Sequence, residues 1–143
     1  MTSGWDVSMT TGVPSVDSEH KELFRQVGAL NQAMREGKGR NEISKILNFV
    51  GDYVVSHFAN EEKAMDQYCC PAAQANKQAH NQCIAKFKEL QNRFESVGAS
   101  SALTLEIHDT LKNWLVQHIR QIDTQLLACT QAGKNKPVLA ASR

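Results

Sequence analysis

The sequence lacks the features that mark secreted, membrane-spanning or strongly charged proteins. Its first twelve residues, MTSGWDVSMTTG, have neither the basic start nor the apolar segment of a secretory signal. No run reaches the ~18 apolar residues that a membrane span needs. The 16 basic and 15 acidic residues are mixed along the chain, which leaves no basic field for nucleic acid or anionic lipid. We therefore expect a cytoplasmic protein without nucleic-acid or membrane partners.

Cysteine is scarce and lacks a recognisable pattern. The four residues, Cys69, Cys70, Cys83 and Cys129, show no C-x-x-C spacing. Without a secretion signal, an even number of cysteines does not argue for a disulfide framework, so we expect free thiols. The adjacent pair Cys69-Cys70 is either redox-active or an inert pair at the end of a helix.

Strand-like alternation and internal repeats are also missing, and helical spacing is what the chain shows instead. Apolar residues recur every three to four positions in four segments. The expected helices run from Asp17 to about residue 36, from about Asn41 to Pro71, from Pro71 to about residue 97, and from about residue 103 to Gly133.

The length of 143 residues and the 41% hydrophobic content are those of one globular domain. Four amphipathic helices with short connections favour antiparallel neighbours. The predicted fold is all-α, an up-down-up-down four-helix bundle over residues 1–133. Residues 1–17 form an extended N-terminal arm in which Trp5 lies on the body of the domain. Residues 134–143 form a polar tail or linker.

Four of the five histidines fall on the predicted apolar faces, each on a different helix. They are His20, His57, His80 and His118. One such histidine is more often a hydrogen-bonded core residue than a ligand, but four in one bundle favour a metal site. The fifth, His108, lies at the edge of its apolar face, and we interpret it as a non-ligand.

Two carboxylates stand near these histidines in the sequence. Glu61 lies one turn after His57 on the same face, and a buried carboxylate needs a cation. The alternative is that Glu61 and Glu62 face water. Asp123 follows His118 by five residues, which is about 140° round a regular helix. Only a widened, π-like turn would bring Asp123 inward, so spacing alone does not select it.

The combined pattern is specific. It consists of His20, then His57-x-x-x-Glu61, then His80, then Trp114-Leu115-x-x-His118-x-x-x-x-Asp123, with further matches at Trp5, Gly12-Val13, Asp17, Glu62, Met65 and Pro71. This order resembles the bacterial hemerythrins, which are non-heme diiron oxygen-binding four-helix bundles. The resemblance covers nearly the whole chain and implies an oxygen-binding domain rather than an enzyme.

The resemblance also implies the ligand set. His20 and His57 would hold one iron ion, and His80 and His118 the other. Glu61 and Asp123 would bridge the pair beside an oxo or hydroxo group. The implied cofactor is therefore two non-heme iron ions bridged by oxo or hydroxo and two carboxylates. Asp123 enters the ligand set through the resemblance, since spacing did not select it.

One position departs from the family pattern. The family has a further histidine one turn before the position of His80, where this chain has Asn76. The missing ligand belongs to the iron that normally carries three histidines and has no free position. An amide oxygen is a poor neutral donor for iron, so we expect water or a small anion in the gap. The alternative is that Asn76 has abolished metal binding.

Four residues match or adjoin the family's apolar oxygen pocket. Met65 and Leu115 resemble pocket-lining positions, and Trp114 stands nearby. Cys83 lies three residues after His80, where the family often has an aromatic residue, so its smaller side chain would open the pocket. The alternative for all four is that they are ordinary core residues.

Three functions are compatible with this interpretation, and dioxygen or small anions are the expected ligands of each. Sensing of oxygen or redox state is preferred, because an opened iron works against protected storage. Similar domains occur fused to signalling outputs such as diguanylate cyclases and chemoreceptors, and the tail would suit a link to a fused C-terminal domain. Oxygen carriage or storage is the second interpretation. An iron-dependent oxidase or peroxidase is the third, although no acid or base in the sequence points to a substrate.

Overall fold

The structure is a computed structural model that describes residues 5–98 and 100–134, and the described part is helical without strands. The elements are η1 (Val7–Met9), α1 (Pro14–Arg35), α2 (Arg40–Gln67), α3 (Ala73–Val97), α4 (Ser101–His118), η2 (Ile119–Asp123) and α5 (Gln125–Lys134). η1 is a short 3-10 turn, and η2 is a turn of π-helix. None of these helices is both long and apolar enough to cross a membrane.

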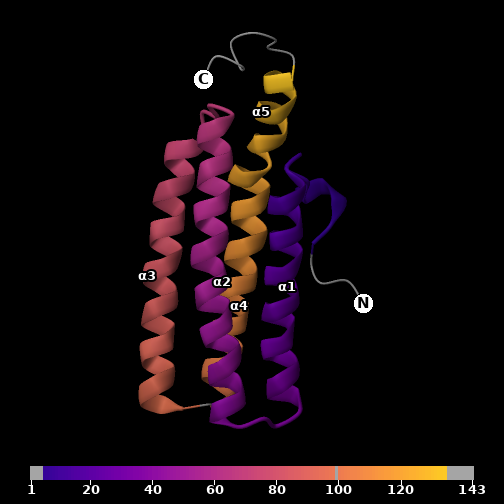
Figure 1. Cartoon of the computed structure of the whole chain (residues 1–143). Coiled ribbons are helices and arrows are strands. Elements are labelled where there is room, and N and C mark those ends of the chain that lie inside the picture. Colours follow the sequence, from indigo (N-terminus) through magenta and orange to yellow (C-terminus); the bar gives the residue numbers. More distant parts are fainter. Residues whose placement is uncertain (1–4, 99, 135–143) are drawn as a thin grey trace.

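Helices α1 to α4 run antiparallel to their neighbours in sequence, and α5 extends the line of α4 beyond the bundle (Figure 1). Short connections at residues 36–39, 68–72 and 98–100 enforce this order. The N-terminal arm folds back so that η1 contacts η2. The predicted four-helix bundle is confirmed. Of the expected tail, only Lys134, the last residue of α5, lies within the described residues.

The first helix begins earlier than the sequence suggested. α1 starts at Pro14, three residues before Asp17. Proline suits a first helical turn because its fixed φ is helical and the N–H it lacks would have no partner there. The Asp17 carboxylate instead accepts hydrogen bonds from the Thr11 N–H and hydroxyl, both at 2.9 Å. The arm therefore ends at Val13, and Asp17 anchors it to the helix.

Two other helix boundaries also differ from those that the sequence predicted. Pro71 lies in the turn between α2 and α3, and α3 begins at Ala73. The predicted fourth helix is interrupted by η2 and continues as α5. The helices α2 and α3 thus meet in a tight corner close to α5.

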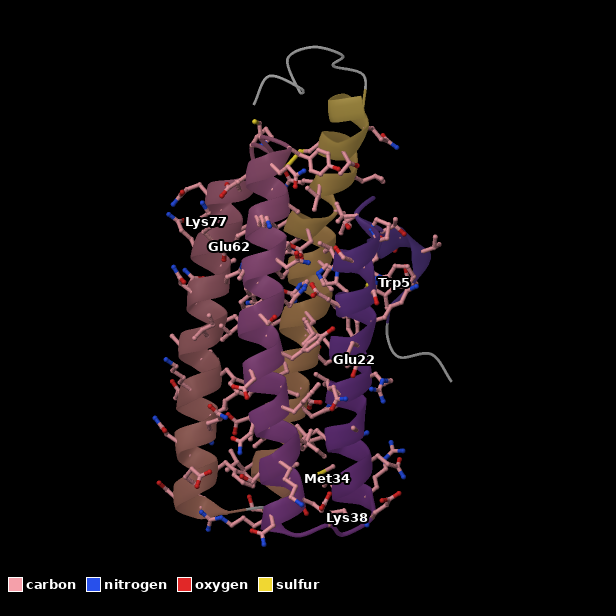
Figure 2. All side chains as sticks on the ribbon, in the orientation of Figure 1. Trp5, Glu22, Met34, Lys38, Glu62 and Lys77 are labelled. Atoms are coloured by element: carbon pink, nitrogen blue, oxygen red, sulfur yellow. A yellow bond between two sulfur atoms is a disulfide. The ribbon has the colours of Figure 1, made fainter. Side chains whose placement is uncertain are left out.

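A disulfide joins this corner to α5, so the expectation of free thiols is wrong for two cysteines. Cys70 lies in the connection between α2 and α3, and Cys129 lies on α5, with 5.5 Å between their Cα atoms. The bond lies beside α5 in Figure 2. Because the two residues are 59 positions apart, only tertiary packing brings them together. Cys69 is exposed and Cys83 is buried.

The apolar core has two parts separated by a polar layer. The larger cluster fills most of the bundle and includes Leu23, Phe58, Cys83, Leu115 and Ile119. The smaller cluster lies toward α5 and consists of Val16, Ala64, Met65, Cys70, Ala72 and Leu126. Helices α1, α2 and α3 each pass from one cluster to the other through a buried polar stretch, and α4 does so by way of η2 and α5. The residues of this polar layer are His20, His57, Glu61, Asn76, His80, His118 and Asp123.

Candidate metal centre

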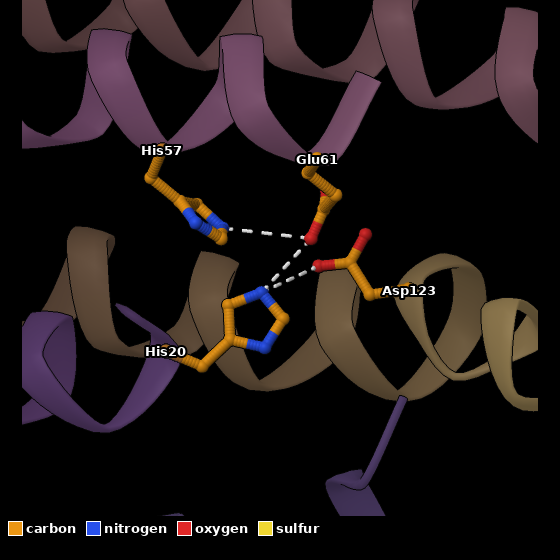
Figure 3. A group of neighbouring side chains, drawn as sticks. All are labelled: His20, His57, Glu61 and Asp123. Carbon is orange, nitrogen blue, oxygen red and sulfur yellow. Dashed lines mark hydrogen bonds and ion pairs between the residues drawn. The ribbon is translucent and has the colours of Figure 1, made fainter. Parts of the chain in front are cut away.

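One half of the polar layer is a group of four side chains from three elements. His20 of α1, His57 and Glu61 of α2, and Asp123 of η2 place one ligand atom each within 4.8 Å of the others (Figure 3). The Nε2 atom of His20 lies 2.9 Å from Glu61 Oε2 and 3.2 Å from Asp123 Oδ2. The Nε2 atom of His57 lies 3.5 Å from Glu61 Oε2. We call this set the first donor group.

The second donor group shares both carboxylates. It consists of Glu61, His80 of α3, His118 of α4 and Asp123. Here His80 Nε2 lies 2.9 Å from Glu61 Oε1, and His118 Nε2 lies 3.0 Å from Asp123 Oδ1. Each carboxylate therefore turns one oxygen to each group. This is the arrangement required of two carboxylates that bridge a pair of cations.

Asp123 reaches the layer because of the π-helical turn. The Thr124 N–H donates to the Ile119 carbonyl at 2.9 Å, a bond that spans five residues instead of four. The wider turn brings a residue five positions after His118 back to the same face. The π-like turn that Asp123 needs in order to face inward is therefore present. The Asp123 side chain is 1% exposed.

Two further carboxylates contact the far sides of the histidine rings, and sequence reasoning predicted neither contact. His57 Nδ1 lies 2.9 Å from Glu19 Oε1, which also accepts from Asn60 at 3.0 Å. His80 Nδ1 lies 2.8 Å from Glu62 Oε2. The alternative that Glu62 simply faces water is therefore wrong. Glu19 had no sequence signal, because its partner lies 38 residues away on another helix.

Burial and the neighbouring charged groups shift the pKa values in this layer in opposite directions, and the neighbouring groups have the larger effect. Burial lowers the pKa of His20, but hydrogen bonds and charge from Asp123 and Glu61 raise it to about 9. The same balance raises the pKa of His118 to about 9. Burial raises the pKa of Glu61, yet hydrogen bonds from His118, His20 and the other two histidines hold it well below its usual range. The two carboxylates thus draw positive charge into the layer.

The donor chemistry fits a pair of metal ions. A neutral imidazole whose Nδ1–H donates to a carboxylate presents a lone pair at Nε2. In the metal-free protein the Nε2 sides of His57 and His80 face Glu61 as hydrogen-bond donors. A metal ion would take the place of these hydrogens, and the Nε2 lone pairs and the Glu61 oxygens would then bind it together. Imidazole and carboxylate donors are those that suit divalent iron, although they also suit other first-row metals.

Asn76 lies in the same layer, beside the second donor group. It is one turn before His80 on α3 and fully buried. Its Oδ1 atom lies 2.8 Å from His118 Nε2, and its Nδ2 atom has no hydrogen-bond partner among the described residues. The chain therefore places a neutral amide at the position where the resemblance leads one to expect another imidazole.

A small cavity adjoins the layer on the side of the larger cluster. Its volume of about 10 Å³ is the space that one water molecule needs. The lining residues are Leu23, Val27, Val50, Val54, Phe58, Cys83, Leu111, Trp114 and Leu115. Of the four residues expected around an oxygen pocket, Cys83, Trp114 and Leu115 line this cavity, and Met65 packs in the smaller cluster.

Aromatic rings separate this cavity from the second donor group. Phe58, which the sequence had not indicated, stacks on His80 with ring centroids 3.7 Å apart. Trp114 stacks on His118 at 4.3 Å. Burial raises the pKa of the Cys83 thiol to about 12, so this cysteine remains a neutral lining group. His108 pairs with Asp109 and belongs to neither donor group.

Comparisons with known proteins agree with this geometry. The family model "Hemerythrin HHE cation binding domain" matches residues 11–129. The chain is 30% identical over 119 residues to a bacteriohemerythrin of Pseudomonas paraeruginosa, covering 83% of this chain and 75% of that protein. It is 30% identical over 122 residues to a bacteriohemerythrin of Methylococcus capsulatus, covering 85% and 91%.

A further relative and a solved structure agree as well. Myohemerythrin-1 of Phascolopsis gouldii is 32% identical over 119 residues, covering 83% of this chain and 87% of that protein. A crystal structure of wild-type hemerythrin superposes with a TM-score of 0.76 at 29% identity, covering 87% of this chain and 95% of that one. The family match spans every residue of both donor groups. The chain therefore belongs to the hemerythrin family.

Proposed function

We propose that this domain binds two iron ions and uses them to sense dioxygen or redox state. The observation that carries the proposal is the sharing of Glu61 and Asp123 between two donor groups. His20 and His57 would hold one ion, and His80 and His118 the other. Bound iron would supply the electron exchange with dioxygen that side chains of this kind do not provide.

The rest of the layer keeps these ligands in place. Glu19 and Glu62 accept from the Nδ1 atoms of His57 and His80, which fixes the tautomer and orientation of both rings. The two apolar clusters close the layer on either side, since all six ligand residues are at most 6% exposed. Exclusion of water would protect the centre from loss of metal and from uncontrolled oxidation.

Sensing is supported by the way Asp123 is connected. The π-helical turn that carries this ligand leads through Thr124 directly into α5. The same turn is held by the N-terminal arm, through the ion pair of Arg120 with Asp6 at 3.0 Å. The Cys70–Cys129 disulfide fixes α5 from the other side. A change in ligation at Asp123 would therefore reach α5, whose C-terminal end is where a following output segment would attach.

Oxygen carriage is the second candidate, and the apolar cavity favours it. Leu115, Trp114 and Phe58 enclose a space beside the ligands that has no charged lining. Such a space suits a small uncharged ligand that must be kept from water. Carriage differs from sensing in that it requires no response from α5.

Two measurements test the proposal. Metal analysis of protein prepared without air is expected to give about two irons per chain, and zinc or no metal would refute the centre. Hydrogen exchange of the iron-loaded protein is then compared before and after exposure to air. Sensing predicts a change in amide protection of α5, with helix α1 between residues 23 and 35 as an internal control. Reversible oxygenation without any change in α5 would favour carriage instead.

A further inference from the structure

Asn76 is the one amide side chain in a layer of ionisable ligands, and it is fully buried. It projects from α3 one turn before His80 and is 0% exposed. Its Nδ2–H group has no acceptor among the described residues. A buried donor without an acceptor is destabilising, so a position of this kind calls for a ligand.

Metal binding would also remove the partner of the other amide atom. The Asn76 Oδ1 atom accepts from His118 Nε2 at 2.8 Å. The same nitrogen lies 3.0 Å from Asp123 Oδ1 and is the ligand atom of the second donor group. A nitrogen that gives its lone pair to a metal has no hydrogen to donate. Both ends of the Asn76 amide would then be unsatisfied inside the protein.

The second donor group also leaves room on its metal. The chain supplies two histidines and two shared carboxylate oxygens to each group. Sets of two histidines with carboxylate leave open positions on iron. Because the Asn76 amide lies 2.8 Å from His118 Nε2, a ligand taken up by the second group next to His118 would lie within reach of Asn76. A ligand there would be bound by the metal and would accept a hydrogen from Nδ2.

We propose that the second donor group contains a position for a small monoanion, and that the Asn76 Nδ2–H group donates to it. This proposal rests on the iron centre proposed above. The anion must be small, because Asn76, His80 and His118 are each at most 6% exposed. Negative charge is favoured because the ligand lies between a cation and an N–H donor. The first donor group has its own open position, so the chain offers two anion positions.

Azide is a suitable probe, because it is a linear monoanion of three atoms. Iron-loaded, oxidised protein is first analysed for iron and then titrated with azide by calorimetry and visible absorption. The wild type is expected to bind two azides per chain. Asn76→His is expected to bind one, because the imidazole takes the second position.

A variant of nearly equal size separates the hydrogen bond from the open position. Asn76→Leu keeps the volume and the open position but lacks the N–H group. It is expected to bind two azides, the second about tenfold or more weakly than in the wild type, the effect of one hydrogen bond to a charged group. Asn92→Leu, the same change at an exposed position of α3, is the control and is expected to match the wild type. This comparison remains informative even if Asn76→His does not fold.

The outcomes distinguish this inference from the proposed function. A wild type with two irons that binds a single azide would overturn the second anion position and indicate that Asn76 Oδ1 occupies it or that one anion spans both ions. Equal azide affinity in Asn76→Leu and the wild type would overturn the role of the Nδ2–H group. Fewer than two irons per chain would refute the proposed centre itself.

Discussion

The two donor groups use the same carboxylates and the same number of histidines, yet their surroundings differ. In the first group, Glu19 holds His57 and is itself held by Asn60. In the second group, Glu62 holds His80, and Asn76 contacts His118. The rings of Phe58 and Trp114 stack on the two histidines of the second group, whereas in the first group Phe58 makes only a tilted contact with His57, with ring centroids 5.9 Å apart. Similar ligand sets can thus differ in the access and polarity of their surroundings.

The number of histidines in each donor group bears on where a small ligand would bind. The resemblance to the family leads one to expect an iron with no free coordination position at the second group, because a third histidine would occupy the last position. Asn76 removes that distinction, so both groups present two histidines. Differences in reactivity between them would then come from surrounding side chains rather than from ligand number.

The largest effect is expected from removing a carboxylate that both donor groups share. Glu61→Ala is expected to release both ions and to destabilise the fold by about 3–5 kcal/mol, since it leaves four buried histidines without their common carboxylate. Iron analysis and thermal unfolding measure both effects. Glu42→Ala, at an exposed site on the same helix, is the control. Full iron content in Glu61→Ala would show that Glu61 is not a ligand.

A more selective change separates the two groups. Glu19→Gln is expected to weaken the ion held by His57, and Glu62→Gln the ion held by His80. A neutral amide supports the ring less well than a carboxylate, and loss of such a partner typically costs 10- to 100-fold in metal affinity. Competition with a chelator measures this, and the expected product is a chain with one iron. If neither substitution alters metal retention, these carboxylates have no part in holding the centre.

A third substitution tests the role of Asn76 in the second donor group. Asn76→His is expected to fill the open position of the second group and so to prolong the visible absorption that oxygen induces. Overpacking would cost about 1–3 kcal/mol, so a modest fall in thermal stability is expected as well. Stopped-flow mixing of the reduced protein with air-saturated buffer measures the lifetime. A wild type that keeps this absorption as long as the variant would favour carriage over sensing.

The smallest expected effect on the centre concerns the cavity. Leu115→Ser is expected to admit water beside the second group and to speed oxidation of the reduced protein while iron content stays the same. It also removes buried apolar volume, at a cost of about 2–5 kcal/mol. Leu103→Ser, near the start of the same helix and also buried, controls for stability alone. Equal oxidation rates in the two variants would assign Leu115 a purely structural role.

Helical periodicity accounts for most of what could be predicted. A histidine on the apolar stripe of a helix must face the core, because the same 3.6-residue spacing that orients Leu23 orients His20. The same argument holds for His57, Glu61 and His80. The bundle and the inward direction of these ligands therefore follow from local pattern.

Contacts between helices could not be predicted in this way. The partners Glu19 and His57, or Asn76 and His118, are about 40 residues apart, and which side chains meet depends on how the helices are rotated and shifted when they pack. The same limit explains the missed Cys70–Cys129 disulfide, since α5 comes to lie beside the α2–α3 corner only when α4 packs into the bundle.

The four helices and the inward-facing histidines follow from the sequence, because apolar residues repeated with a helical period form a single apolar face. The tertiary structure alone decided the π-helical turn at Asp123, the carboxylates behind the rings and the position of the Asn76 amide. Each of these depends on a small local shift, one extra residue in a turn or one contact across a helix pair. Such shifts depend on the packing of the whole bundle, which local spacing does not record.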